Sequence, residues 1–401
     1  MTELSQQRKV RRLVLPLLNW YDRSARALPW RRTRDPYAIW VAEIMLQQTQ
    51  VKTVIPFWER WMKALPTIAA LASASSEKIH KLWEGLGYYT RVRNLQRAAA
   101  IIQERHGGKF PEDIQEMLEL PGIGRYTAGA ISSIAFNQAQ PILDGNVIRV
   151  LARVFGIGEN VRQKETRSRL WKIAEALVCA AARRSRGKKP EKDACSRLNQ
   201  SLMELGALVC TPKGPQCFIC PVRTQCAARR SGEVERFPVN DLPVATTQRR
   251  FVAFVAEHDG RLLVRQRPRG VVNGRLWEFP NREVTTSDPD LTALAREATG
   301  LGSLTPNPWF SLKHSITRYR IQLDVFRVQR IDTALPPKAM GMWLTRRQLK
   351  TRAFASAHGK ILERIEHRKT PNFKLQTPGN IQKASSNNQV SFNGQQLKFE
   401  S

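Results

Sequence analysis

The sequence predicts an all-α region followed by a smaller α+β domain. From about Leu13 to Cys226, apolar residues recur at helical spacing between breaks at Pro, Gly or Ser. From Phe251 the pattern changes to alternating strands, so the 401 residues are expected to build two separate cores. We expect a helical region at 1–228, a linker at 229–248, the α+β domain at 249–367 and a disordered tail at 368–401.

The charge of the chain favours a polyanionic partner. Lys and Arg number 65 against 34 Asp and Glu, which gives a formal charge of +31. Nucleic acid is the first candidate, because neutralised phosphates release counterions on binding. A membrane surface is the competitor, but no run approaches the roughly 18 apolar residues of a spanning helix.

The location and assembly of the chain are expected from the same observations. Met1 to Arg12 carries charges where a signal peptide needs an apolar stretch. We therefore expect a chain that is not secreted and stays in the cytoplasm, near the nucleoid in a bacterium. We also expect it to act as a monomer. A basic run at 183–192 is either a solvated loop or a DNA contact.

Two stretches of the helical region contain candidate functional groups. Asp35 and Pro36 precede a helix predicted from about Tyr37 to Gln50. Further on, the turn at 120–124 leads into a helix and then into Leu143-Asp144-Gly145-Asn146. Backbone N–H groups of this turn, which holds Gly122 and Gly124, could bind a phosphate. Simple capping of the helix explains the same residues equally well.

Four cysteines near the end of the helical region form a candidate metal site. Cys210, Cys217, Cys220 and Cys226 are spaced as C-x6-C-x2-C-x5-C. In a reducing compartment, clustered cysteines are more often ligands than disulfides. Four thiolates suit either zinc or a [4Fe–4S] cluster, and the C-x2-C spacing alone does not separate them.

The α+β domain shows clear local signals. Two apolar runs, at 251–255 and 262–264, flank Asp259-Gly260, which is typical of a β-hairpin. Residues 319–325 alternate between apolar and polar, as a half-buried strand does. Residues 290–299 read as a helix that Gly300 ends.

Several motifs in one order resemble a known family. Pro121-Gly122-Ile123-Gly124 matches its hairpin, Asp144 its aspartate, the cysteine spacing its cluster loop, and residues 42–51 (AEIMLQQTQV) a stretch typical of its adenine-specific members. The chain thus resembles the helix-hairpin-helix DNA glycosylases of the MutY type, closely from about Leu13 to Ala227. The resemblance implies two helical lobes with DNA between them, a [4Fe–4S] cluster rather than zinc, and a C-terminal Nudix-like (MutT-like) domain.

Glu43 and Asp144 are the expected catalytic pair. Glu43 would lie on a helix that is apolar on nearly every side, which raises the pKa of a carboxyl group and keeps a proton available. The family places its catalytic glutamate there. Cleavage of an N-glycosidic bond needs a proton for the leaving base and an anion for the cationic sugar, so we expect these roles for Glu43 and Asp144. The resemblance also implies that Asn146 orients Asp144.

Residue 126 divides the family. Relatives with lyase activity resemble this hairpin but have a lysine whose amine forms a Schiff base with the sugar. This chain has Tyr126, which predicts base excision by hydrolysis with little strand cleavage.

Recognition residues follow from the same resemblance. It implies that Trp30, Arg31 and Gln200 hold the extruded adenine, and that Gln48, Thr49 and Tyr88 enter the duplex beside the orphaned base. In the second domain, residues 295–301 lack the paired glutamates of a Nudix hydrolase, so this domain is expected to recognise 8-oxoguanine. Many relatives have Phe-Ser-His where this chain has Ile-Thr-Arg, so Thr317 is the expected lesion contact.

The sequence therefore predicts a monofunctional glycosylase that removes adenine mispaired with 8-oxoguanine or guanine in double-stranded DNA. One alternative is an endonuclease III-like enzyme acting on oxidised pyrimidines. The other is a catalytically silent DNA-binding protein that uses only the hairpin and the charge.

Overall fold

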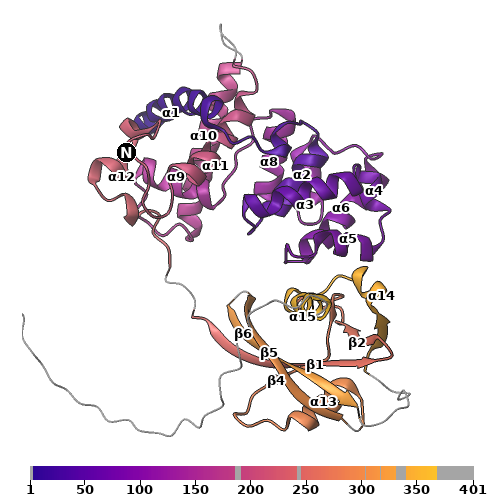
Figure 1. Ribbon diagram of the computed structural model, residues 1–401. Helices are drawn as coiled ribbons and strands as arrows, with labels where there is room; N and C mark the ends of the chain where they lie inside the picture. The colour runs from indigo at the N-terminus through magenta and orange to yellow at the C-terminus, as the bar shows by residue number, and fades with distance from the viewer. Residues whose placement is uncertain are drawn as a thin grey trace, which may run out of the picture.

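The computed structural model describes residues 3–185, 191–241, 245–302, 304–316, 318–330 and 340–367. A helical region is followed by a domain built on a mixed sheet (Figure 1). Within the described residues, no helix is long and apolar enough to cross a membrane. The predicted disordered tail and the centre of the basic run at 183–192 lie outside the described residues.

The helical region forms two lobes around one continuous apolar core. One lobe contains η1 (Pro29–Arg31), α2 (Pro36–Leu46), α3 (Val51–Ala64), α4 (Ile68–Ala72), α5 (Ser76–Trp83), α6 (Thr90–Arg105), α7 (Ile114–Glu119) and α8 (Arg125–Phe136). The other contains α1 (Glu3–Ser24), α9 (Gly145–Phe155), α10 (Lys164–Ser185), α11 (Ala194–Leu208), η2 (Arg223–Gln225) and α12 (Ala227–Ser231). The N-terminal helix α1 packs on α10 and α11 of this second lobe.

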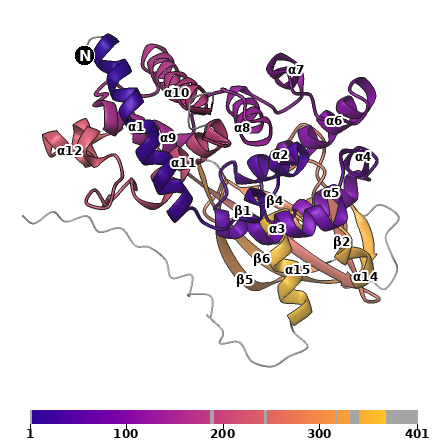
Figure 2. The ribbon, with the colours of Figure 1, turned by 90° about the horizontal axis from the view of Figure 1, so that it is seen from above.

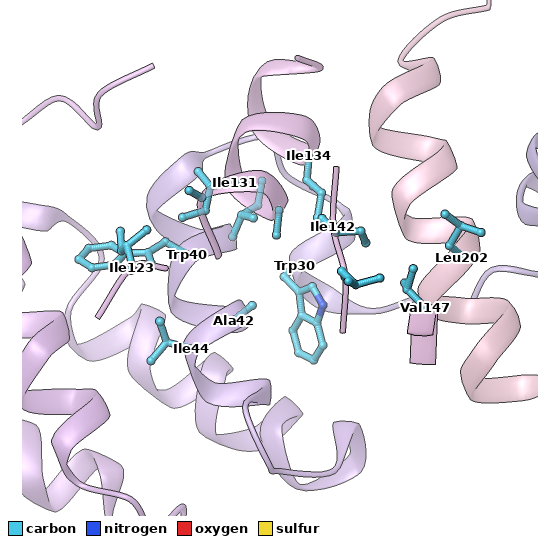
Figure 3. Packing of buried hydrophobic residues seen from close by; sticks show 14 of the residues in the cluster. Trp30, Trp40, Ala42, Ile44, Ile123, Ile131, Ile134, Ile142, Val147 and Leu202 are labelled. Atoms are coloured by element: carbon cyan, nitrogen blue, oxygen red, sulfur yellow. The ribbon is translucent and has the colours of Figure 1, made fainter. Parts of the chain in front are cut away.

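Helix α2 lies at the centre of this core. Asp35 caps it by accepting a hydrogen bond from the backbone N–H of Tyr37, and Pro36 occupies its first position. Nine of its eleven residues are buried. Figure 3 shows Trp40 and Ala42 of α2 in the core with Ile131 of α8.

The predicted end of this helix at Gln50 was wrong. Helix α2 ends at Leu46, and Gln48 has a φ of 58°. The left-handed region is incompatible with a continuing helix. The guanidinium of Arg91, on helix α6, donates hydrogen bonds to the carbonyl groups left free at this end.

The predicted hairpin turn joins α7 to α8. Gly122 has a φ of +82°, and a Cβ at this position would lie 2.9 Å from Cβ of Asn94. Both facts exclude a larger residue there. Gly124 precedes the first turn of α8, and a Cβ built on it would meet nothing within 4 Å. The turn is therefore tight on its inner side and open at Gly124.

The C-terminal domain contains seven strands and three helices in its described part. They are β1 (Thr247–His258), β2 (Arg261–Gln266), β3 (Trp277–Glu278), β4 (Asn281–Val284), α13 (Leu291–Thr299), β5 (Leu304–Ile316), β6 (Tyr319–Arg330), β7 (Met342–Thr345), α14 (Arg346–Lys350) and α15 (Ser356–Glu366). The strand order is β3-β2-β1-β6-β5, with β4 paired to β1 and β7 to β2. Strands β1 and β6 are parallel, with Phe251 opposite Leu323.

Each face of the sheet has its own core. Residues of α15 pack on one face and residues of α13 on the other. Helices α14 and α15 lie on the side toward the helical region, with α3 and α5 above the sheet (Figures 1 and 2). Backbone and side-chain hydrogen bonds join the two parts, including one from Nζ of Lys81 to the carbonyl of Arg352 at 3.0 Å.

Residues 227–241 stay against the helical region. The last part of helix α12, up to Ser231, and η3 (Val234–Arg236) lie within the stretch expected as a linker. Phe237 is buried, and the N–H of Val161 donates to the carbonyl of Val239 at 3.0 Å. Local periodicity missed this segment because its contacts are with distant helices.

Candidate active site

A cavity of about 690 Å³ lies where the two helical lobes meet. It is lined by residues from η1, α2, α8, α9 and α11. Nine of the residues predicted from the sequence line it: Trp30, Arg31, Glu43, Gln48, Thr49, Tyr126, Asp144, Asn146 and Gln200. The cavity is in the size range of small-molecule sites, about 300 to 1,000 Å³, and could hold one extruded base.

Glu43 and Tyr126 form a direct contact in this cavity. The hydroxyl of Tyr126 donates to Oε2 of Glu43 at 2.8 Å. The pKa of Glu43 is raised to about 7, mainly by burial; the Tyr126 hydrogen bond opposes this rise and the nearby Asp144 adds to it. Glu43 therefore carries a proton in a large fraction of molecules at neutral pH. Burial and the two carboxylates also raise the pKa of Tyr126, so its hydroxyl stays protonated.

Asp144 is fixed at the start of α9. Its Oδ1 accepts a hydrogen bond from the N–H of Val147 at 2.7 Å, and its Oδ2 accepts one from Nδ2 of Asn146 at 2.9 Å. Burial raises the pKa of Asp144, whereas these hydrogen bonds favour its carboxylate. Asn146 thus contacts Asp144, as expected.

The support for Asp144 extends to the cysteine loop. Nη2 of Arg149 donates to Oδ1 of Asn146 at 2.8 Å, and Nε donates to the carbonyl of Cys210 at 2.7 Å. Gly206 permits this arrangement, because a Cβ there would lie 2.6 Å from Cβ of Asn146. One arginine therefore connects the backbone of a cysteine to the amide that orients Asp144.

Glu204 is a site residue that the sequence analysis missed. Its carboxylate is buried and accepts hydrogen bonds from Arg26 Nη2 at 2.7 Å and Arg31 Nη2 at 2.8 Å. Burial alone would raise the pKa of Glu204, but these two guanidinium groups hold it at about 2. Glu204 lies four residues after Gln200 on α11, so the two side chains are on the same face of the helix. This spacing could have indicated Glu204 from the sequence.

Gln200 is also held by the N-terminal helix. The hydroxyl of Tyr21 donates to Oε1 of Gln200 at 2.9 Å, and the guanidinium of Arg31 lies over the Tyr21 ring. Trp30 is buried and packs edge-on against Trp58, with 6.0 Å between the ring centroids. The predicted base-binding side chains are therefore supported by packing on two helices.

Arg91 joins the two segments predicted to enter the duplex. Its Nη1 donates to the carbonyls of Ile44, Met45 and Gln47 at 2.6 to 3.1 Å, at the end of α2. Its Nη2 donates to the carbonyls of Leu86 and Gly87. The residues that follow these carbonyls, Gln48 and Tyr88, both have positive φ, at 58° and 48°.

These two segments differ in position. Tyr88 is 48% exposed and does not line the cavity, whereas Gln48 does. Backbone conformations that cost energy persist where surrounding contacts fix them. Arg91 fixes the backbone next to both positive-φ residues, Gln48 and Tyr88.

The four predicted ligand cysteines line one small cavity between α9 and the loop at 210–226. None of them forms a disulfide. Arg153, fully buried, donates to Sγ of Cys210 at 3.4 Å and to the carbonyl of Thr211 at 2.7 Å. Among the described residues, no three thiols converge closely enough to hold a single ion.

The predicted lesion contact Thr317 lies outside the described residues, between strands β5 and β6. In the stretch compared with Nudix hydrolases, Oε1 of Glu297 accepts a hydrogen bond from Nε of Arg282 at 2.8 Å. Tyr88 and the hairpin residues Gly122 and Gly124 lie outside the catalytic cavity.

Comparisons with known proteins identify both regions. Residues 41–176 match the HhH-GPD superfamily of base excision DNA repair proteins, and residues 251–364 match the NUDIX domain. The chain is 35% identical over 411 residues to the adenine DNA glycosylase of Homo sapiens, covering 86% of this chain and 72% of that protein. The chain belongs to the adenine DNA glycosylase family.

Other relatives match over shorter stretches. The adenine DNA glycosylase of Rattus norvegicus is 48% identical over 223 residues, which is 53% of this chain and 41% of that protein. Among solved structures, a thermostable thymine-DNA glycosylase has 28% identity and a TM-score of 0.49, and it covers 56% of this chain and 98% of its own. The predicted family, its helical glycosylase fold and its NUDIX domain are confirmed. The protein is thus an adenine glycosylase of base excision repair.

Proposed function

We propose that this adenine glycosylase acts on adenine opposite 8-oxoguanine or guanine in double-stranded DNA, with Glu43 as general acid and Asp144 as the stabilising anion. The observation that supports this most directly is the pair of carboxyl groups on one cavity, of which Glu43 has its pKa raised to about 7. Such a group can give up a proton at neutral pH.

The proposed reaction uses the two carboxyl groups in sequence. Glu43 gives its proton to N7 of adenine while the bond from N9 to the sugar breaks and its electrons move into the purine. The carboxylate of Asp144 stabilises the positive charge that develops on the sugar. Water then adds to the anomeric carbon and gives a proton to the carboxylate of Glu43, which restores the general acid and leaves a neutral sugar product. Tyr126 and Asn146 orient the two carboxyl groups through the hydrogen bonds described above.

Substrate binding is assigned to the walls of the cavity. Trp30, Arg31 and Gln200 hold the extruded adenine, while Gln48, Thr49 and Tyr88 occupy the space in the duplex that it leaves. The open turn at Gly124 binds a phosphate of the DNA backbone through its N–H groups. The NUDIX domain recognises 8-oxoguanine, with Thr317 as a contact, and the enzyme works as a monomer in the compartment that holds the DNA.

Cys210, Cys217, Cys220 and Cys226 are proposed to hold a [4Fe–4S] cluster. When bound, the cluster would supply a thiolate-ligated, redox-active centre that holds the four cysteines of the loop together. Arg149 and Arg153 hold this loop from the protein side. An absorption band at about 400 nm in the purified protein, lost together with iron on chelation, tests this assignment, because zinc is colourless.

Single-turnover excision measures the proposed function. The substrates are duplexes with A:8-oxoguanine, A:G, A:T and an oxidised pyrimidine, and Asp144→Asn is the control variant. We expect adenine release from the first two duplexes and its loss in Asp144→Asn. Release of the pyrimidine would favour an endonuclease III-like specificity. Tight binding to A:8-oxoguanine without any release by the wild type would contradict the proposed catalytic roles.

A further inference from the structure

A second cavity, of about 400 Å³, lies between helix α5 and the C-terminal domain. Ser76, Glu77 and His80 line it from the helical side, and Arg267, Arg275 and Arg352 line it from the other. None of its residues belongs to the catalytic cavity. Both structural regions therefore contribute to a site that the excision chemistry does not use.

The walls of this cavity are strongly basic. Four arginines line it, because Arg269 joins the three named above, whereas Glu77 is the one acidic residue in its lining. Glu77 is paired with Arg352, and Arg267 is paired with Glu278 behind the wall. Within the described part of the chain, the guanidinium of Arg275 has no hydrogen-bond or ion-pair partner. The cavity thus has positive charge that its own residues do not neutralise.

His80 lines the same cavity and has an unpaired, buried polar atom. Its side chain belongs to a residue only 3% exposed, and its Nε2 has no hydrogen-bond partner among the described residues. A buried polar atom without a partner is unfavourable, so a group that gives it a hydrogen bond at this cavity would be stabilised. Burial, followed by the charges of Arg93 and Arg275, lowers the pKa of His80 to about 4, so its ring is neutral at physiological pH.

Arg275 is held in a costly conformation. Its φ is 67°, which a long side chain rarely adopts. The guanidinium of Arg93 donates to the carbonyl of the preceding residue, Gly274, at 3.4 Å. A side chain of the helical region therefore holds the backbone next to Arg275, which lies beside the cavity and near His80.

We propose that this cavity binds a phosphate group, presented by a free nucleotide or by the DNA backbone. Guanidinium groups bind phosphate oxygens through paired hydrogen bonds, and a neutral imidazole can donate one more. The volume exceeds that of a phosphate alone and falls in the range of nucleotide-sized ligands. Because His80 belongs to the helical region and Arg275 to the C-terminal domain, a bound phosphate bridges the two.

The test is calorimetric titration of the full chain with inorganic phosphate, at an ionic strength held constant with chloride. The variants Arg275→Gln and His80→Gln each remove one proposed contact. Gln carries a Cβ as Arg does, so the substitution leaves the backbone strain at the positive φ of residue 275 unchanged. Arg261→Gln is the matched control, since Arg261 is an exposed arginine of the same domain outside the cavity.

We expect one saturable site in the wild type and in Arg261→Gln, and an affinity reduced about tenfold or more in each of the other variants. No saturable site in the wild type would overturn the proposal, as would an unchanged affinity in Arg275→Gln when its melting temperature is also unchanged. If His80→Gln lowers the melting temperature but Arg275→Gln does not, the phosphate affinity of Arg275→Gln alone tests the proposal.

Two further titrations distinguish the sources of the phosphate. Inorganic phosphate and dAMP are titrated into the protein saturated with an undamaged duplex. Loss of both binding events by competition identifies the DNA backbone as the source. Retained binding, still sensitive to Arg275→Gln, identifies a free nucleotide.

Discussion

The hydroxyl of Tyr126 lies 2.8 Å from Oε2 of Glu43, so residue 126 of the hairpin helix directly contacts the proposed general acid. In family members with lyase activity the corresponding residue is a lysine. Here the contact has an electrostatic effect, because the hydrogen bond lowers the pKa of Glu43 against the rise caused by burial.

Tyr126→Phe is expected to shift the pH dependence of excision. Without the hydroxyl, the pKa of Glu43 rises further, so the fall in rate at high pH moves to higher pH. The unpaired oxygen of Glu43 should cost about 1 to 3 kcal/mol of stability. Single-turnover rates from pH 5 to 9 measure the shift. A midpoint unchanged from the wild type would show that the hydroxyl does not act on Glu43.

Borohydride trapping tests the hydrolytic assignment. The wild type should give no covalent complex with substrate DNA, because Tyr126 has no amine to form a Schiff base. Tyr126→Lys introduces one and is expected to give a trapped complex that is visible after denaturing electrophoresis. Efficient trapping of the wild type would contradict hydrolysis as its main reaction.

Arg91→Met should impair the segments that hold Gln48 and Tyr88. The change leaves the carbonyls at the end of α2 and in the 86–87 loop without their donor, and we expect about 2 to 3 kcal/mol of destabilisation with at least tenfold slower excision. Arg91→Lys keeps the charge but not the planar fork, so it should rescue only in part. Arg97→Met, an exposed arginine of the same helix, is the control. A normal excision rate in Arg91→Met would show that Arg91 does not position these segments for excision.

Glu204→Gln should destabilise the protein in a pH-dependent way. Breaking the ion pairs with Arg26 and Arg31 is expected to cost about 3 kcal/mol, at the low end for buried pairs because Arg26 is partly exposed. Because folding lowers the pKa of Glu204 from 4.5 to about 2, its stabilisation is complete above 4.5 and disappears as the pH falls through 2. Urea unfolding of wild type and variant from pH 3 to 7 measures this difference, with the exposed Glu175→Gln as control. A constant difference across that range would exclude Glu204 as its source.

Local sequence signals predicted much of the fold. The hairpin at Asp259-Gly260 forms with both residues at positive φ, and α13 ends at Thr299 with Gly300 in the left-handed region, as predicted. These features depend on neighbouring residues, so periodicity and turn chemistry are sufficient to find them.

Residues whose roles depend on distant contacts could not be found in this way. Arg91 acts on carbonyls more than forty positions earlier in the chain, which local propensity cannot indicate. Glu204 and Arg149 likewise gain their roles only where helices α9 and α11 meet the N-terminal segment and the cysteine loop. The same reason explains the early end of α2, since the guanidinium that satisfies its last carbonyls comes from another helix.

The pH dependence of single-turnover adenine release by the wild type tests the central claim most directly, because it reports the proton on Glu43. With a pKa of about 7, Glu43 is protonated below that pH and loses its proton above it. The rate constant for A:8-oxoguanine duplexes should therefore be constant at low pH and fall about tenfold per pH unit above the midpoint. A rate that stays constant or increases from pH 6 to 9 would contradict the assignment of Glu43 as the general acid.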